Sequence, residues 1–410
     1  MPYPPNAFSA AAPKAGRSHA VGWRGLRDRT RAARALVALC ALAGTAGCSP
    51  MYVLRGAVAE AKILSRRRPI AAVVADPATG PRTRHKLQLV LDVRGYAART
   101  IGLRTGESYT TISWVDSDTL LLVLQAAPKL AFTSYRWWFP IVGSVPYKGY
   151  FDFDKARADA RALERQGYDA YVRPSSAFST LGWFNDPVLN TILRYDDVDL
   201  ANTVVHELTH NTLYPPSQVS FNESLANFVG GHGAIDYFCR VEGTASPHCD
   251  LARRRWHDDL LFGRFLSDLV ARLEAVYART DLPATTRLAM RDTVFGQARV
   301  RWTAQYEPQL VSDQYHGWAR RAVLNNAALI ARRIYYDRLD LFEAAYARSG
   351  SNLTTFVQAV KRAVAGEKDA FQAIAALAGT VPAVGPPPAP APPATTRLPT
   401  PGPTATTAAP

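Results

Sequence analysis

Helical spacing of hydrophobic residues dominates this sequence, and strand-like alternation is confined to its first half. Segments with helical spacing before residue 200 are 56–67, 83–100 and 154–166. Strand-like segments, rich in β-branched and aromatic residues, are 109–114, 119–125 and 168–172. The turn-like Val115-Asp-Ser-Asp118 separates the first two of these, so we expect a small sheet in this half.

The second half is predicted to be almost entirely helical. Leu200–Leu213 has helical spacing and stops at Pro215-Pro216, because proline cannot continue a helix. A second helix, Phe221–Val229, is expected to end at Gly230-Gly231. Residues 253–365 are rich in Ala, Arg and Leu at helical spacing. Strands early and helices late predict an α+β fold with a largely helical C-terminal half.

The first 47 residues have the composition of an export signal. A basic stretch ends at Arg34, and the apolar run Ala35–Gly44 that follows is too short to span a membrane. Thr45-Ala-Gly-Cys48 comes next and resembles a bacterial lipobox, although Thr45 replaces the usual Leu. We therefore predict a lipoprotein signal peptide over 1–47, cleaved before a lipidated Cys48.

The alternative is a simple secretory signal in which Cys48 is an ordinary residue. Both interpretations export the protein to the cell envelope, facing the periplasm. With lipidation, Cys48 would be the membrane anchor, and the following Ser49 favours the outer membrane.

The far C-terminus is a different kind of segment. Residues 381–410 consist almost entirely of Pro, Ala, Thr and Gly, with Arg397 as the one charged residue. Such a segment cannot bury enough apolar surface to offset its ordering entropy, so we predict a disordered tail. One folded domain is then expected over 48–380. No run of twenty apolar residues occurs, so no permanent transmembrane helix is predicted.

The formal net charge of +14 is reduced once the predicted signal is removed. Residues 1–47 carry seven Lys and Arg against one Asp, a net +6, which leaves +8 for the mature chain. These basic residues are scattered and form no RNA- or DNA-binding motif. We therefore expect no nucleic-acid partner. The charge is consistent with an anionic membrane surface or anionic ligands as partners, but we favour solvation alone.

Two cysteines remain in the mature body. Cys239 and Cys249 flank the polar, turn-like stretch 241–248, and an oxidising compartment favours a disulfide between them. The alternative is two free buried thiols.

The candidate chemistry lies in His206-Glu-Leu-Thr-His210. Residues four apart share one helix face, so both imidazoles can bind a single zinc ion. Glu207 lies about 100° around the helix from His206. It cannot join that pair as a ligand, but its carboxylate can reach a water molecule held by the metal.

A third ligand is expected from the following helix. Glu223 lies thirteen positions after His210, and a tight turn into an antiparallel helix would return its carboxylate over the histidine pair. Asn227, one turn later, is a candidate to accept a hydrogen bond from a ligand imidazole. The alternative is a buried helix whose His and Glu side chains bond only to one another. We favour the metal because two His and two Glu at compatible spacings agree.

Several motifs resemble known metallopeptidases. Asn222-Glu-Ser-Leu-Ala226 resembles the second motif of the gluzincins, at a shorter spacing than in thermolysin. The body, from about Cys48 to Ala365, resembles bacterial lipoproteins that form a family of predicted zinc aminopeptidases. The segments that carry this resemblance are Trp137–Pro140, Val145–Phe151, Ser179–Pro187, His206–Tyr214, Phe221–Ala226, and Asn325–Ala327 followed by Tyr335. Trp138 and Ser144 depart from the family, which has Cys there, so a local disulfide is missing.

The resemblance implies a zincin-like domain that hydrolyses peptide bonds through a metal-activated water, with Glu207 as general base. It also implies a hydrogen-bond donor for the oxyanion. For that role Tyr335 or Tyr336 is preferred over Tyr214 and His232. The alternative for either preferred tyrosine is packing into the helical core.

Ser179–Pro187 precedes the metal helix by about twenty residues. Thr180–Phe184 is a candidate edge strand for pairing with substrate, and Asp186 a candidate for contact with a substrate amine. For Asp186 we favour the alternative, a turn or cap before Pro187. The aromatic residues between 135 and 139 are expected to be core.

The sequence therefore predicts a zinc-dependent peptidase, most simply an aminopeptidase, that acts on peptides and is tethered to the membrane by lipid. One alternative is an endopeptidase acting on envelope proteins. Another is a catalytically idle envelope scaffold lipoprotein, which the intact Glu207 disfavours.

Overall fold

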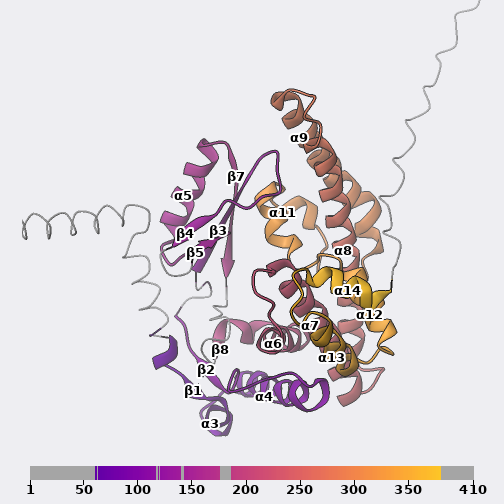
Figure 1. Cartoon of the computed structure of the whole chain (residues 1–410). Helices are drawn as coiled ribbons and strands as arrows, with labels where there is room; N and C mark the ends of the chain where they lie inside the picture. Colours follow the sequence, from indigo (N-terminus) through magenta and orange to yellow (C-terminus); the bar gives the residue numbers. More distant parts are fainter. Residues whose placement is uncertain are drawn as a thin grey trace, which may run out of the picture.

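A computed structural model describes residue 61 and residues 63–379, apart from 117–118, 120, 140–142 and 176–185. The predicted signal peptide 1–47, the lipidation site Cys48, the tail 381–410 and the candidate strand Thr180–Phe184 lie outside the described residues. The described chain is a mixed α+β structure, in which small sheets lie beside a larger helical part (Figure 1).

The main sheet is antiparallel and has the strand order β6-β3-β7. Its strands are β3 (Leu121–Pro128), β6 (Lys148–Tyr150) and β7 (Tyr168–Ser175). Helix α5 (Phe153–Arg165) packs on one face, and α11 (Asn326–Arg333) packs on strands β3 and β7 from the helical part. The apolar contacts with α5 come from alternate strand residues, including Leu122, Leu124, Ala126 and Ala170.

Two further sets of strands are short. Strands β1 (Arg68–Pro69), β2 (Thr111–Ser113) and β8 (Val188–Leu189) form a second sheet, in which β2 and β8 are parallel. A separate hairpin pairs β4 (Trp137–Phe139) with β5 (Gly143–Val145).

That hairpin contains Trp138 and Ser144, the two positions at which the sequence departs from the family that it resembles. Its register places Trp138 directly opposite Ser144. Two cysteines at directly opposite positions can be close enough to bond, so the two departures fall at one structural point.

The largest hydrophobic core surrounds the two helices that carry the candidate metal ligands, α6 (Asp197–Thr212) and α7 (Val219–Val241). Phe221, Phe228 and Phe342 are among its largest fully buried side chains. Other elements around this core include α3 (Ile70–Ala75), α4 (Pro81–Tyr96), the π-helical turn η1 (Ala97–Ile101), the 3-10 turn η2 (Asn190–Arg194), α12 (Leu339–Arg348), α13 (Leu353–Ala363) and α14 (Ala370–Ala378).

A second core lies between two long helices, α8 (Pro247–Tyr277) and α9 (Ala284–Arg301). Trp302 fills its centre against Phe262 and Phe265. The chain then returns through the short turns η3 (Trp302–Tyr306), η4 (Glu307–Gln309) and α10 (Trp318–Arg321). None of the helices described is both long and apolar enough to cross a bilayer.

Most predicted elements in the described part of the chain are confirmed within a few residues. The predicted end of the helix that carries Glu223, at Gly230-Gly231, is wrong. Helix α7 runs through Gly230-Gly231 to Val241. Its glycines mark close packing: a Cβ on Gly231 would lie 2.5 Å from the Trp256 ring of α8. Burial against α6 and α8 therefore outweighs the helix propensity that glycine lacks.

A disulfide joins Cys239, near the end of α7, to Cys249, in the first turn of α8. The loop it closes is the polar stretch that the sequence marked as a turn. The cross-link fixes α8 relative to the helix that carries Glu223.

Candidate metal centre

The first metal helix, α6, begins at a well-capped N-terminus. The Asp196 carboxylate accepts a hydrogen bond from the Asp199 N–H at 3.0 Å. Asp197 and Asp199 add negative charge where the helix dipole is positive. This cap fixes where α6 begins. His206 and His210 lie on one face of its last turns.

A short connection turns the chain back from α6 to α7. The buried Asn222 side chain donates to the Pro215 carbonyl at 2.8 Å and so closes this connection. A Cβ on Gly230 would lie 3.3 Å from His206 Cβ and 3.0 Å from the Asn202 carbonyl oxygen, so glycine lets the two helices approach closely. The tight turn and this close approach bring Glu223 over the histidine pair.

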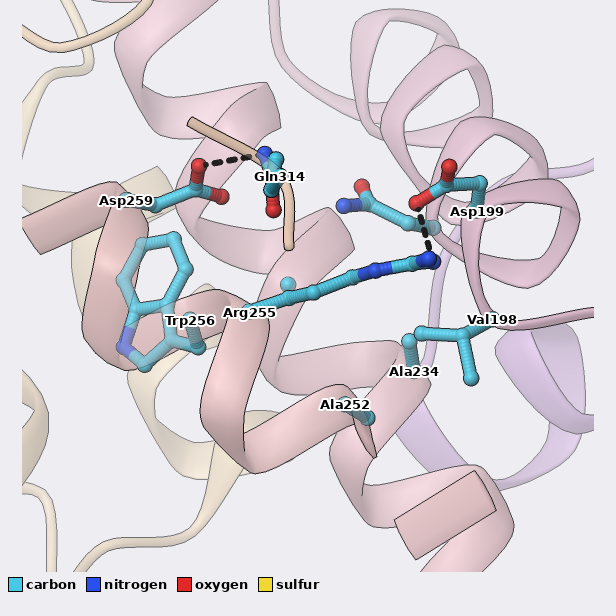
Figure 2. A pocket seen from close by; sticks show the side chains of 10 residues that line it. Val198, Asp199, Ala234, Ala252, Arg255, Trp256, Asp259 and Gln314 are labelled. Carbon is cyan, nitrogen blue, oxygen red and sulfur yellow. Dashed lines mark hydrogen bonds and ion pairs between the residues drawn. The ribbon is translucent and has the colours of Figure 1, made fainter. Parts of the chain in front are cut away.

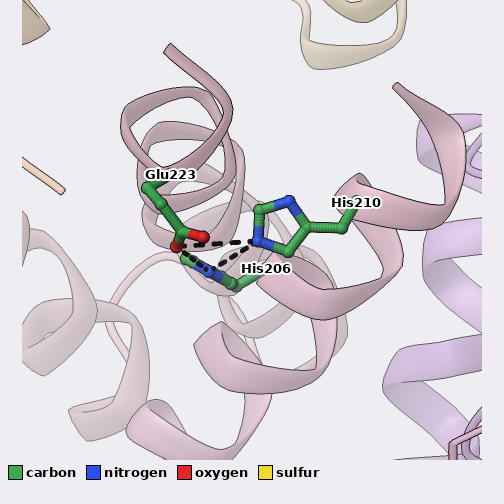
Figure 3. A group of neighbouring side chains, drawn as sticks. All are labelled: His206, His210 and Glu223. Carbon is green, nitrogen blue, oxygen red and sulfur yellow. Dashed lines mark hydrogen bonds and ion pairs between the residues drawn. The ribbon is translucent and has the colours of Figure 1, made fainter. Parts of the chain in front are cut away.

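The three candidate ligand atoms converge on one point, as Figure 3 shows. His206 Nε2 and His210 Nε2 are 3.2 Å apart, and they lie 3.4 Å and 3.7 Å from Glu223 Oε2. Ligands about 2.0–2.1 Å from a tetrahedral Zn²⁺ are themselves roughly 3.3 Å apart. The donor set and its spacing therefore fit a zinc-sized ion held by two imidazoles and one carboxylate.

Electrostatics keep the carboxylate ionised. Burial alone would raise the pKa of Glu223, but hydrogen bonds and charge from His206 and His210 outweigh burial and hold that pKa well below its usual range. Burial lowers the pKa of His206, whereas the hydrogen bond to Glu223 and the charge of Glu207 raise it more. Two imidazoles, once deprotonated, and one ionised carboxylate supply the donor types that a zinc ion takes in proteins.

Glu207 lies beside the cluster without belonging to it. Helix geometry turns its side chain about 100° away from that of His206. After burial, the charge of Glu207 is the next cause that raises the pKa of the buried Tyr109. The same charge contributes to the raised pKa of Tyr335. The charge of Glu207 therefore acts on two tyrosines, one of which lies beside the His206 ring.

Tyr335 faces the ligand pair from the turn after α11. Its ring centroid is 6.2 Å from that of His206. Burial, followed by the charge of Glu223, raises the Tyr335 pKa well above its usual range, so the hydroxyl keeps its proton at neutral pH. It is therefore available as a hydrogen-bond donor next to the site.

Helix α7 holds this tyrosine as well as the ligand Glu223. Asn227 Nδ2 donates to the Tyr335 carbonyl at 2.9 Å. Ser224 Oγ donates to the Ile334 carbonyl at 2.8 Å and accepts from the Asp337 N–H at 2.9 Å. Asn227 therefore contacts the Tyr335 backbone, and no bond from it to either imidazole is found among the described residues.

The other oxyanion candidates lie in different surroundings. The Tyr336 hydroxyl hydrogen-bonds to that of Tyr315 at 2.9 Å, and its ring packs against Phe262. His232 is paired with Glu343 at 2.8 Å among aromatic rings, about half a helix turn around α7 from Glu223. Tyr214 packs edge-on against the His210 ring at 5.7 Å. Tyr335 and Tyr214 are thus the candidates beside the metal ligands.

The structure also describes the surroundings of the aromatic segment 135–139 and of Asp186. Tyr135 and Trp137 pack into the core under the main sheet, whereas Trp138 is 59% exposed. The Asp186 carbonyl accepts a hydrogen bond from the Tyr109 N–H at 3.1 Å.

Two residues near the site were missed by the sequence analysis. Arg173, on β7, lowers the pKa of both Tyr335 and Tyr147, although other effects raise both values overall. Tyr147 precedes β6 and feels the charge of Glu223. The available signal was the alternation along β7, which places Arg173 on the same face as Asp169 and Tyr171.

A separate pocket lies between α6, α7 and α8 (Figure 2). Four of its polar side chains form two pairs. Arg255 reaches Asp199 at 2.7 Å, and Gln314 donates to Asp259 at 2.9 Å. None of the three candidate ligands lines this pocket, and the pair of Arg255 and Asp199 connects α8 with α6.

The sequence profile of a protein family described as "Putative aminopeptidase" matches residues 51–373. No curated protein and no solved structure matches the chain. The matched range contains all three candidate ligands, Glu207 and Tyr335.

Proposed function

Because the chain belongs to the family described as "Putative aminopeptidase", we propose that it is a zinc-dependent peptidase whose ion is held by His206, His210 and Glu223. The observation that carries this proposal is the convergence of three donor atoms at the spacing of a tetrahedral zinc site. The alternative is a cluster of side chains that bind only one another. It would bring two imidazole nitrogens within 3.2 Å of each other beside a largely buried carboxylate, with no ion to hold the three groups together.

The ion, when bound, would act as a Lewis acid and make a water molecule more acidic. Glu207 would accept the proton of that water as it attacks the scissile carbonyl, and return the proton to the leaving amine. The protonated Tyr335 hydroxyl would donate a hydrogen bond to the oxygen that becomes negatively charged. Asn227 and Ser224 would keep Tyr335 in place.

We further propose that the enzyme removes amino-terminal residues and works in the cell envelope, anchored by a lipid on Cys48. The family description supports the first part, and the lipobox-like sequence before Cys48 supports the second. An endopeptidase is the alternative activity.

Metal content tests the ligand set directly. The purified wild-type chain should hold about one zinc per molecule, and His210→Ala should lose it, because two remaining ligands bind weakly. His316→Ala is a matched control, since its side chain is 55% exposed and belongs to another part of the fold. Equal zinc in wild type and His210→Ala would refute the proposed site.

Turnover tests the chemistry separately. Glu207→Gln should keep its zinc and lose about 100- to 10,000-fold in kcat, as expected for removal of a general base. An aminopeptidase must also lose activity on a peptide whose amine is acetylated. If the acetylated peptide is cleaved as fast as the free one, the enzyme is an endopeptidase. If Glu207→Gln cleaves like wild type, Glu207 is not the base.

A further inference from the structure

One face of β7 carries a row of polar side chains toward the helical part of the molecule. Tyr168, Ala170 and Val172 pack into the core with α5. Asp169, Tyr171 and Arg173 alternate with them and therefore project from the opposite face. In Figure 1 the arrowhead of β7 points toward the part of the molecule that contains α6 and α7.

The first two members of this row bind neighbouring elements. Asp169 forms a buried ion pair with Arg291 and accepts a hydrogen bond from the Asn326 N–H at 2.8 Å. Tyr171 accepts from Arg332 of α11 at 3.2 Å, and the same guanidinium lies over its ring at 5.1 Å. Asp169 thus joins the sheet to α9 and α11, and Tyr171 joins it to α11.

Arg173, the third member, has no such partner among the residues that the structure describes. Its Nε atom is buried and makes no hydrogen bond. No carboxylate in the described part of the chain forms an ion pair with its guanidinium. A half-buried arginine without a counter-ion is costly, because a charge removed from water needs a partner of opposite sign.

Two tyrosines near Glu223 connect Arg173 with the candidate metal centre. Its charge acts on the Tyr335 and Tyr147 hydroxyls, which also feel the charge of the ligand Glu223. Across the sheet Arg173 is opposite Val123, which is in turn opposite Gly149, two residues after Tyr147. Directly opposite residues share a face, so Arg173 and the Tyr147 end of β6 border the same side of the sheet.

We propose, building on the peptidase function above, that Arg173 and Tyr147 form a carboxylate-binding subsite for the substrate. A guanidinium offers paired N–H donors that match the two oxygens of a carboxylate. The hydroxyl of Tyr147, a residue that is 44% exposed, is a further donor on the same side of the sheet. The carboxylate is either the free C-terminus of a short peptide or an acidic side chain, and both present the same group.

Binding of three probe peptides to the full-length zinc-loaded Glu207→Gln variant tests this proposal without turnover. The probes are Ala-Ala-Ala as the free acid, its C-terminal amide, and Ala-Asp-Ala amide. The free acid should bind about 10- to 100-fold more tightly than the amide if the C-terminus is recognised, a gain typical of a charge-assisted hydrogen bond. Tighter binding of Ala-Asp-Ala amide than of Ala-Ala-Ala amide would assign the subsite to a side chain.

Adding Arg173→Gln should abolish that preference and leave the affinity for Ala-Ala-Ala amide unchanged. Arg173→Lys should restore part of that preference, because lysine keeps the positive charge but lacks the paired N–H donors of the guanidinium. Arg161→Gln, which removes a charge from the exposed side of α5, is the matched control and should change nothing.

In the enzyme with Glu207 intact, Arg173→Gln should raise KM for the preferred peptide and leave kcat unchanged. Equal binding of all three probes, or an equal loss for all three in Arg173→Gln, would overturn the subsite. Because binding is measured without turnover, that failure is distinct from failure of the peptidase function, which would appear as absent zinc or absent Glu207-dependent hydrolysis.

Discussion

At the scale of single residues, two neighbouring tyrosines have opposite environments. Tyr335 faces His206, whereas Tyr336 is hydrogen-bonded to Tyr315 and packs against Phe262. The sequence marked both as equivalent candidates, because adjacent residues in a turn carry no periodicity that separates them. Only their tertiary contacts, with His206 on one side and with Tyr315 and Phe262 on the other, distinguish them.

Tyr335→Phe should lower kcat about 100-fold and leave the zinc content unchanged, because one donor to the developing oxyanion is removed. Tyr336→Phe is the matched control. It should keep its kcat and lose about 1 kcal/mol of unfolding free energy with its hydrogen bond to Tyr315. Steady-state kinetics and urea unfolding measure the two effects. A large loss of kcat in Tyr336→Phe alone would contradict the assignment.

At the scale of elements, α7 shows why local rules misplaced a boundary. Two consecutive glycines usually predict a helix end. Here the two glycines allow α6 to pack closely on one side of α7 and Trp256 of α8 on the other. The helix then continues to the disulfide at Cys239. The energy that keeps the helix intact comes from packing with distant segments, which no local pattern contains.

Gly230→Ala should therefore separate α6 from α7 and weaken zinc binding. Its Cβ would lie 2.3 Å from Asn202 Oδ1 as well as close to the α6 backbone, and such overpacking typically costs about 1–3 kcal/mol. Gly296→Ala, in open space on α9, should instead stabilise the protein by about 0.5–1 kcal/mol. Thermal unfolding with and without zinc measures both. A Gly230→Ala protein with normal stability and zinc affinity would show that the close approach is not required.

The parts of the site predicted from sequence are those set by short-range geometry. The spacing of His206 and His210 follows from one helical turn, and the proline break made the return of Glu223 foreseeable. Asn227 was assigned the wrong partner, and Arg173 was missed. Both act through contacts with segments 108 residues away in sequence or across the sheet, which only the tertiary structure defines.

At the scale of the whole molecule, the packing of α8 against its returning chain makes stability depend on pH. Burial raises the pKa of Asp259 to about 7, against the opposing hydrogen bonds from Tyr315 and Gln314 and with help from nearby Asp199 and Asp258. The folded state thus binds the Asp259 proton more tightly than the unfolded state. The stability that this proton gives is complete below about pH 4 and is lost as the pH rises to about 7.

Asp259→Asn should remove this dependence. Between pH 5 and pH 8 the wild type should lose about 2–3 kcal/mol of unfolding free energy through this group, at about 1.4 kcal/mol per pKa unit, and the variant should not. Urea unfolding at the two pH values measures the difference. Asp154→Asn, whose side chain is 97% exposed, is the control and should behave as wild type. Parallel pH profiles for wild type and Asp259→Asn would contradict the assignment.

The contacts from Ser224 and Asn227 to the turn at Ile334–Asp337 also bear on how the fold can be elaborated. They join the helix that carries Glu223 to the turn that carries Tyr335, and the tip that connects α8 to α9 takes part in none of them. Extra chain inserted at the exposed tip between α8 and α9 should therefore be tolerated. Additional binding domains could be inserted there without moving the proposed catalytic residues.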